Sequence, residues 1–115
     1  MEAVEIKPSQ IAKLNDNARK TGLIKLLMSS GIEAKFSTVD VEAIIQTVQN
    51  FETYFDFDEG NDLYGEHDFG SFNFKNEKIF WKIDCYEADS NFYLGADPSD
   101  KTAIRVLTIM LAEDY

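Results

Sequence analysis

The sequence predicts an α+β fold in a single domain: a small antiparallel sheet of about three to four strands, packed on about three helices. Two stretches place apolar residues at helical spacing, and two others alternate apolar and polar residues as half-buried strands do. Glycine, asparagine and serine clusters separate these stretches. A chain of 115 residues is long enough to bury a conventional core. We expect residues 1–115 to form one globular domain, with a flexible start over residues 1–7.

The first half of the chain predicts a helix, a strand and a second helix. Gln10 to Thr21 is an amphipathic stretch, and Gly22 is suited to a left-handed cap at its end. Residues 23–28 are a compact apolar run that ends at serines and a glycine, which favours a buried strand. Ser37 then opens the clearest helix, which we expect to run into Tyr54 or Phe55. Its apolar residues form a helical stripe: Val41, Ile44, Ile45, Val48 and Phe51.

The second half predicts a strand meander followed by a helix. Residues 71–75 and 79–86 alternate in polarity around a turn at Asn76 and Glu77, and residues 92–94 are expected to add a third strand. Asp97 and Pro98 signal a helix start. From Ala103 to Ala112 nearly every residue is apolar, which predicts a buried helix.

Charge is distributed unevenly along the chain, whose net charge is −10. Residues 1–50 hold six acids and six bases, whereas residues 51–100 hold thirteen acids and three lysines. Such a surface repels the phosphates of DNA and RNA, so direct nucleic-acid binding is disfavoured. It attracts a cation or a basic protein surface, although charge of this kind also serves solubility alone.

Cysteine usage and the start of the chain indicate a cytoplasmic protein. Cys85 is the only cysteine, which excludes an internal disulfide and fits a reducing compartment. Its apolar neighbours on the predicted strand favour a core thiol over a nucleophile. The first residues show no secretory signal pattern, and no run approaches the ~18 apolar residues of a membrane span.

Motifs spread across the chain resemble a known family. They are Asn61-Asp62, residues 65–70, residues 80–84, Asp97-Pro98 and residues 105–112. Over roughly residues 11–115 they resemble the uncharacterised bacterial family called domain of unknown function 3768. Leu63 stands where the family usually has proline, and Cys85 where it commonly has tyrosine. The resemblance implies a protein of proteobacteria, often carried on plasmids and other mobile elements, and it implies no particular activity.

His67, the only histidine, is the first candidate for chemistry. It lies between Glu66 and Asp68, and carboxylates beside a histidine favour its use as a general base. Asp84, on the polar side of a predicted strand, could orient the ring. These residues define the alternative hypothesis of a small hydrolase or lyase, working with or without a divalent cation. A structural role is favoured over this chemistry, with His67 and Asp68 bonded to backbone and the glycines at positions 65 and 70 supplying unusual dihedrals.

Metal sites have little support in the sequence. One histidine and one cysteine exclude a structural zinc site of the Cys/His kind within a monomer. The carboxylates between Asp56 and Asp68 suit calcium or magnesium, but the glycine and the twelfth position are out of register with an EF-hand loop. We therefore expect no metal and no cofactor.

An acidic stretch studded with aromatic residues is the candidate interaction surface. Aromatic side chains anchor interfaces, and carboxylates steer and pair with arginine and lysine. The residues that we expect to contact a partner are Asp56, Asp58, Glu59, Asp62, Tyr64 and Glu66. The function predicted is an accessory protein, monomer or homodimer, that blocks the basic surface of a nucleic-acid-binding protein. The mobile-element context points to CRISPR or restriction systems as its target. The simpler alternative is a solvated loop whose aromatics pack under the domain.

Overall fold

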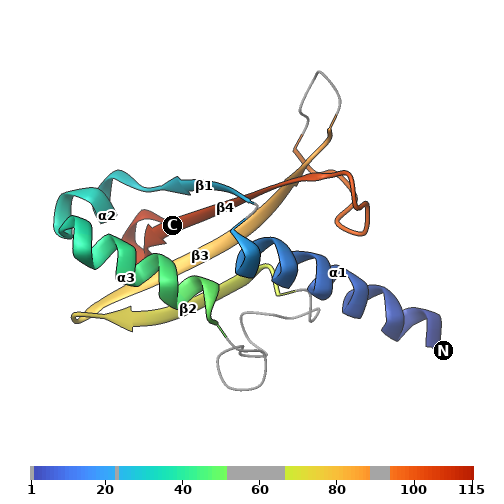
Figure 1. The fold of residues 1–115 in the computed structure, drawn as a ribbon, viewed down its shortest axis with the longest axis horizontal. Coiled ribbons are helices and arrows are strands. Elements are labelled where there is room, and N and C mark those ends of the chain that lie inside the picture. Colours follow the sequence, from blue (N-terminus) through green and yellow to red (C-terminus); the bar gives the residue numbers. More distant parts are fainter. Residues whose placement is uncertain (1, 23, 52–66, 89–93) are drawn as a thin grey trace.

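The computed structural model of the protein describes residues 2–22, 24–51, 67–88 and 94–115 (Figure 1). Its elements are α1 (Glu2–Thr21), β1 (Lys25–Met28), α2 (Ser30–Lys35), α3 (Thr38–Gln49), β2 (Phe69–Phe74), β3 (Glu77–Tyr86), β4 (Ile104–Leu111) and a 3-10 turn, η1 (Ala112–Asp114). The strands form one sheet in the order β1-β4-β3-β2, and α1 and α3 lie in front of it in Figure 1. The predicted α+β class is confirmed. The sheet is mixed, because β1 runs parallel to β4 while the other two pairs are antiparallel.

The last strand, β4, replaces the helix predicted from Ala103 to Ala112, so that prediction is wrong. β4 lies between β1 and β3, and six of its eight residues are buried. A strand covered on both faces loses its polar alternation, and its continuous apolar run is then the same as that of a buried helix. Its β-branched residues favour the strand: Ile104, Val106, Thr108 and Ile109.

The helix start predicted at Asp97 and Pro98 is a pair of turns that leads into β4. The side chain of Asp97 accepts hydrogen bonds from the backbone N–H of Ser99 at 2.9 Å and from its hydroxyl at 2.8 Å. Asp100 bonds Thr102 in the same manner, at 2.9 and 2.7 Å. These bonds to Thr102 hold the pKa of the Asp100 carboxyl below its ordinary value. Aspartate favours such turns for the same reason that it favours helix starts, which explains the error.

The two long helices confirm the predicted stretches but differ at their ends. α1 begins at Glu2, before the predicted Gln10, and ends at Thr21. Gly22 follows it, and its φ of 75° is that of a left-handed cap. The N-cap of α3 is Ser37, as expected, and its hydroxyl accepts from the backbone of Asp40 at 3.2 Å. α3 ends at Gln49 rather than at residues 54–55.

The hairpin of β2 and β3 confirms the two predicted strands. Its turn lies at Lys75 and Asn76, whose φ angles of 48° and 68° fit a type I′ turn, one residue before the predicted position. Of the predicted third strand, only Leu94 is described, and it forms an isolated antiparallel bridge with Tyr86. Cys85 is half-buried. No helix of the described residues has both the length and the apolar composition of a membrane span.

Trp81 lies at the centre of the core, fully buried between the sheet and the helices. The ring of Phe51 meets its indole edge-on at 5.3 Å. Gly70 is its partner on β2, and a Cβ atom there would lie 2.5 Å from the indole nitrogen. The backbone of Gly70 does not have a positive φ, in contrast to the unusual dihedral considered for it. This glycine makes room for the tryptophan.

Candidate functional site

A polar cluster lies between α1 and the core. Among the described side chains of α1, Ile11 and Ala12 are buried, as expected of an amphipathic helix. One and two turns later the same face carries Asn15 and Arg19, whose exposed fractions are 1% and 0%. Buried polar groups are retained when they are hydrogen-bonded, so the partners of these side chains define the cluster.

Arg19 ties α1 to the end of α3. Its guanidinium donates to the carbonyl oxygens of Val48 at 2.5 Å and Gln49 at 3.4 Å, where α3 has no basic residue of its own. It also pairs with Asp16 at 3.0 Å and lies over the ring of Trp81, 5.2 Å from its centroid. A cation at a helix C-terminus satisfies the last carbonyls and complements the helix dipole.

His67 joins the same cluster from the start of β2. Its Nδ1 lies 3.0 Å from both carboxylate oxygens of Asp16, and the residue is largely buried. Its backbone has a φ of 56°, in the left-handed region. The described carboxylate that contacts the ring therefore comes from α1. The pair fixes the chain that enters β2 to the first helix.

Two of the other proposed catalytic residues line a cavity of which His67 is not part. Asp68 and Asp84 both line a cavity of about 220 Å³, whose wall also includes Asn15 and Cys85 but not His67. Asp84 forms an ion pair with Lys82 at 3.1 Å. Glu66 lies outside the described residues. The structure thus brings Asp68 and Asp84 together and turns the His67 ring to α1. Within the described part of the chain, no group of three or more potential metal ligands is placed to hold an ion.

The predicted interaction residues lie outside the described part of the chain, in residues 52–66. They are Asp56, Asp58, Glu59, Asp62, Tyr64 and Glu66. We call residues 52–66 the acidic segment. The residues on either side of it are described: Phe51 is 3% exposed against Trp81, and His67 is held by Asp16. The two residues that flank the acidic segment are therefore anchored in the fold.

Several carboxylates outside the acidic segment are paired with lysines. Lys75 lies 2.9 Å from Asp40 and, by this hydrogen bond, holds the pKa of that carboxyl below its ordinary value. Glu77 bonds Lys35 at 3.0 Å and raises the pKa of that lysine. Exposed pairs of this kind add little stability but neutralise charge.

The arrangement defines a small α+β protein in which a buried Arg-Asp-His cluster joins the first helix to the core. The chain belongs to the family described as protein of unknown function (DUF3768), which matches residues 21–114. The resemblance found in the sequence is confirmed. His67 and Trp81 lie within the matched range, whereas the α1 residues of the cluster precede it. No curated protein and no solved structure matches the chain.

Proposed function

We propose that the protein is an acidic accessory protein that binds and inhibits a nucleic-acid-binding protein. The acidic segment presents carboxylates to a basic surface that otherwise binds phosphates. The finer proposal is a cytoplasmic anti-defence protein of mobile elements, with a CRISPR or restriction protein as its partner. It rests on the context that membership of the family implies.

The observation that carries the proposal is the concentration of charge in the acidic segment. Residues 52–66 contain six acids and no lysine or arginine. The rest of the chain contains fifteen acids and eleven bases, several of them paired with each other. Most of the net charge therefore lies in one short stretch, where complementary charge gives fast association and specificity.

The anchoring of both flanking residues supports the same function. Phe51 packs against the core tryptophan, and His67 contacts Asp16 of α1. The two residues that flank the acidic segment are therefore held in fixed positions. Fixing the ends of a binding segment reduces the conformational entropy lost when a partner binds. The alternative, a small hydrolase or lyase, has weaker support, because His67 faces Asp16 while Asp68 and Asp84 line a separate cavity.

Charge reversal tests the proposal. Replacing Asp56, Asp58 and Glu59 by lysine is expected to abolish capture of a nucleic-acid-binding protein from bacterial lysate, identified by mass spectrometry. Capture by the wild type is expected to fall as salt rises, because ions screen exposed charges. Melting temperatures of all variants are measured in parallel to separate binding from folding.

A matched control makes the same change of net charge outside the acidic segment. In this variant three exposed acids, Glu33, Glu42 and Glu87, are replaced by lysine. It is expected to capture the partner nearly as well as the wild type. Equal loss in the two triple variants would mean that overall charge, and not the acidic segment, governs binding. Full capture by the first variant would refute the role of its three acids.

A further inference from the structure

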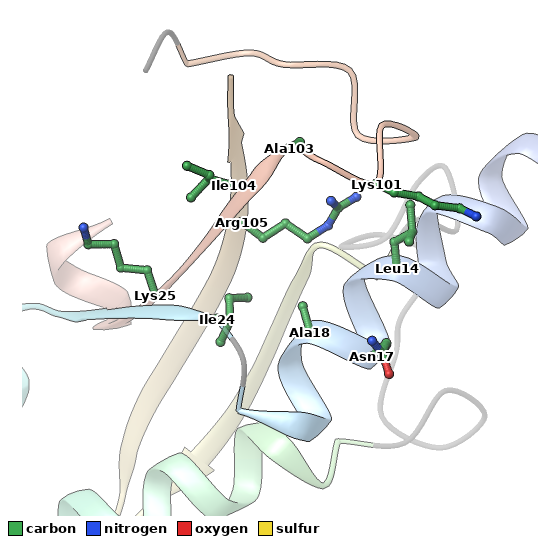
Figure 2. Close-up of a pocket in the computed structure, with 9 residues that line it drawn as sticks. All are labelled: Leu14, Asn17, Ala18, Ile24, Lys25, Lys101, Ala103, Ile104 and Arg105. Atoms are coloured by element: carbon green, nitrogen blue, oxygen red, sulfur yellow. The ribbon is translucent and has the colours of Figure 1, made fainter. Parts of the chain in front are cut away.

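A cationic cavity lies beside α1, in a protein that is otherwise acidic. It has a volume of about 490 Å³ and is bordered by α1, the start of β1 and the chain that enters β4 (Figure 2). Three bases line it, Lys25, Lys101 and Arg105, and none of the described residues that line it is an acid. The chain has 21 acids and only 11 bases, so the charge around this cavity is opposite in sign to the net charge of the protein.

Arg105 is the fixed member of the three. It is 8% exposed, and its guanidinium extends from β4 towards α1. Its Nε donates to Asn15 Oδ1 at 2.7 Å, and its terminal nitrogens donate to the carbonyl oxygens of Pro98 and Asp100. These acceptors are neutral. No carboxylate of the described residues forms an ion pair with Arg105, so the groups at hydrogen-bond distance from its buried charge are neutral oxygens. The Asp100 carboxyl, whose pKa is lowered chiefly by its bonds to Thr102, also feels the positive charge of Arg105.

Lys25 and Lys101 are exposed and form no ion pair with any described residue. In Figure 2 their ammonium groups lie at opposite ends of the cavity, with the Arg105 guanidinium between them. Other lysines of this protein, such as Lys35, Lys75 and Lys82, pair with carboxylates. Three cations around one cavity, none of them in an ion pair with a described carboxylate, create a positive potential that favours an anion.

We propose that this cavity binds a small organic phosphate. A guanidinium offers five N–H groups in a planar fork, and the neutral acceptors of Arg105 use only three of them. The remaining N–H groups suit phosphate oxygens, and flexible lysines add point charges. The apolar part of the ligand packs on the aliphatic wall formed by Leu14, Ile24 and Ile104. The described residues that line this site do not belong to the acidic segment, and its ligand has the opposite charge to the proposed protein partner.

Calorimetric titration with phenyl phosphate tests the site, because this probe joins a phosphate to an apolar ring. Three further probes each remove one feature: phenol lacks the charge, inorganic phosphate lacks the ring, and benzoate replaces the phosphate by a carboxylate. Phenyl phosphate is expected to bind most tightly of the four. Binding of benzoate as tight as that of phenyl phosphate would contradict the assignment to phosphates, and no binding of phenyl phosphate at millimolar concentration would overturn the site.

Variants locate the binding in the cavity. The pair Lys25→Gln and Lys101→Gln is expected to weaken phenyl phosphate binding about tenfold, a loss consistent with two exposed charge interactions. Lys13→Gln and Lys20→Gln form the control pair, since both lysines are exposed and do not line the cavity. The control is expected to change the affinity less than twofold. A third variant, Ala18→Leu, fills the aliphatic side without changing charge and is expected to weaken binding as well.

If the two glutamine pairs weakened phenyl phosphate binding equally, the loss would come from the change of net charge alone, and the site would be refuted. The site would also be refuted if both Ala18→Leu and the pair Lys25→Gln and Lys101→Gln bound phenyl phosphate as tightly as the wild type does. None of these variants alters the acidic segment. Capture of a protein partner is therefore expected to survive them, and the failure of one proposal remains distinguishable from the failure of the other.

Discussion

Replacing Arg19 by alanine is expected to lower the free energy of unfolding by about 3–5 kcal/mol, the usual cost of breaking a buried ion pair. The side chain is fully buried, pairs with Asp16 and satisfies two carbonyl oxygens at the end of α3. Its removal leaves Val48 and Gln49 without this donor and opens a void beside Trp81. The loss is a large part of the ~5–15 kcal/mol by which a domain is stable.

Urea unfolding of wild type and variants measures this effect. Lys13→Ala, at another exposed position on α1, is the control and is expected to change stability by less than about 0.5 kcal/mol. Arg19→Met keeps much of the volume and should lose less than Arg19→Ala, because part of the cost is the void. If Arg19→Ala stays within about 1 kcal/mol of the wild type, the cluster does not join α1 to the core in the way described.

Gly70→Ala is expected to destabilise the protein by about 3 kcal/mol, the upper end of the cost of overpacking a core. The new Cβ atom would lie 2.5–2.7 Å from three atoms of the Trp81 indole. That ring is fully buried, with Phe51 and Arg19 also against it, so it has little room to move. Thermal unfolding followed by circular dichroism measures the loss.

A double-mutant cycle shows whether the clash is the cause. In a Trp81→Leu background, which is itself destabilised, Gly70→Ala should cost about 1 kcal/mol or less, because the indole atoms are gone. Ser71→Ala, the next position on β2, is the control for an alanine in this strand. An equal cost of Gly70→Ala in both backgrounds would mean that backbone conformation, and not the space beside Trp81, requires the glycine.

Local signals explain which elements the sequence predicts well. The start of α3 follows from a serine cap and a helical stripe, and the β2–β3 hairpin from alternation around a turn. β4 is different, because its neighbours on both sides and on both faces decide its conformation. An apolar run such as 104–111 carries no periodicity that separates strand from helix, so only the sheet pairing reveals it.

The polar cluster could be predicted only in part, since its contacts join distant residues. Asp16 and His67 are 51 positions apart, Arg19 and Val48 are 29 apart, and Arg105 and Asn15 are 90 apart. His67 is conspicuous as the only histidine, but nothing beside it in the sequence points to Asp16. One signal was present: Asn15 and Arg19 continue the four-residue spacing of Ile11, which places them on the buried face.

Competition with nucleic acid is the most direct test of the proposed function. The captured partner is purified and immobilised, and binding of this protein is measured by surface plasmon resonance while a DNA or RNA duplex that the partner binds is added. If the acidic segment occupies the phosphate-binding surface, the apparent affinity for this protein falls in proportion to the occupancy of the partner by nucleic acid. Simultaneous binding of both at full affinity would contradict the proposal.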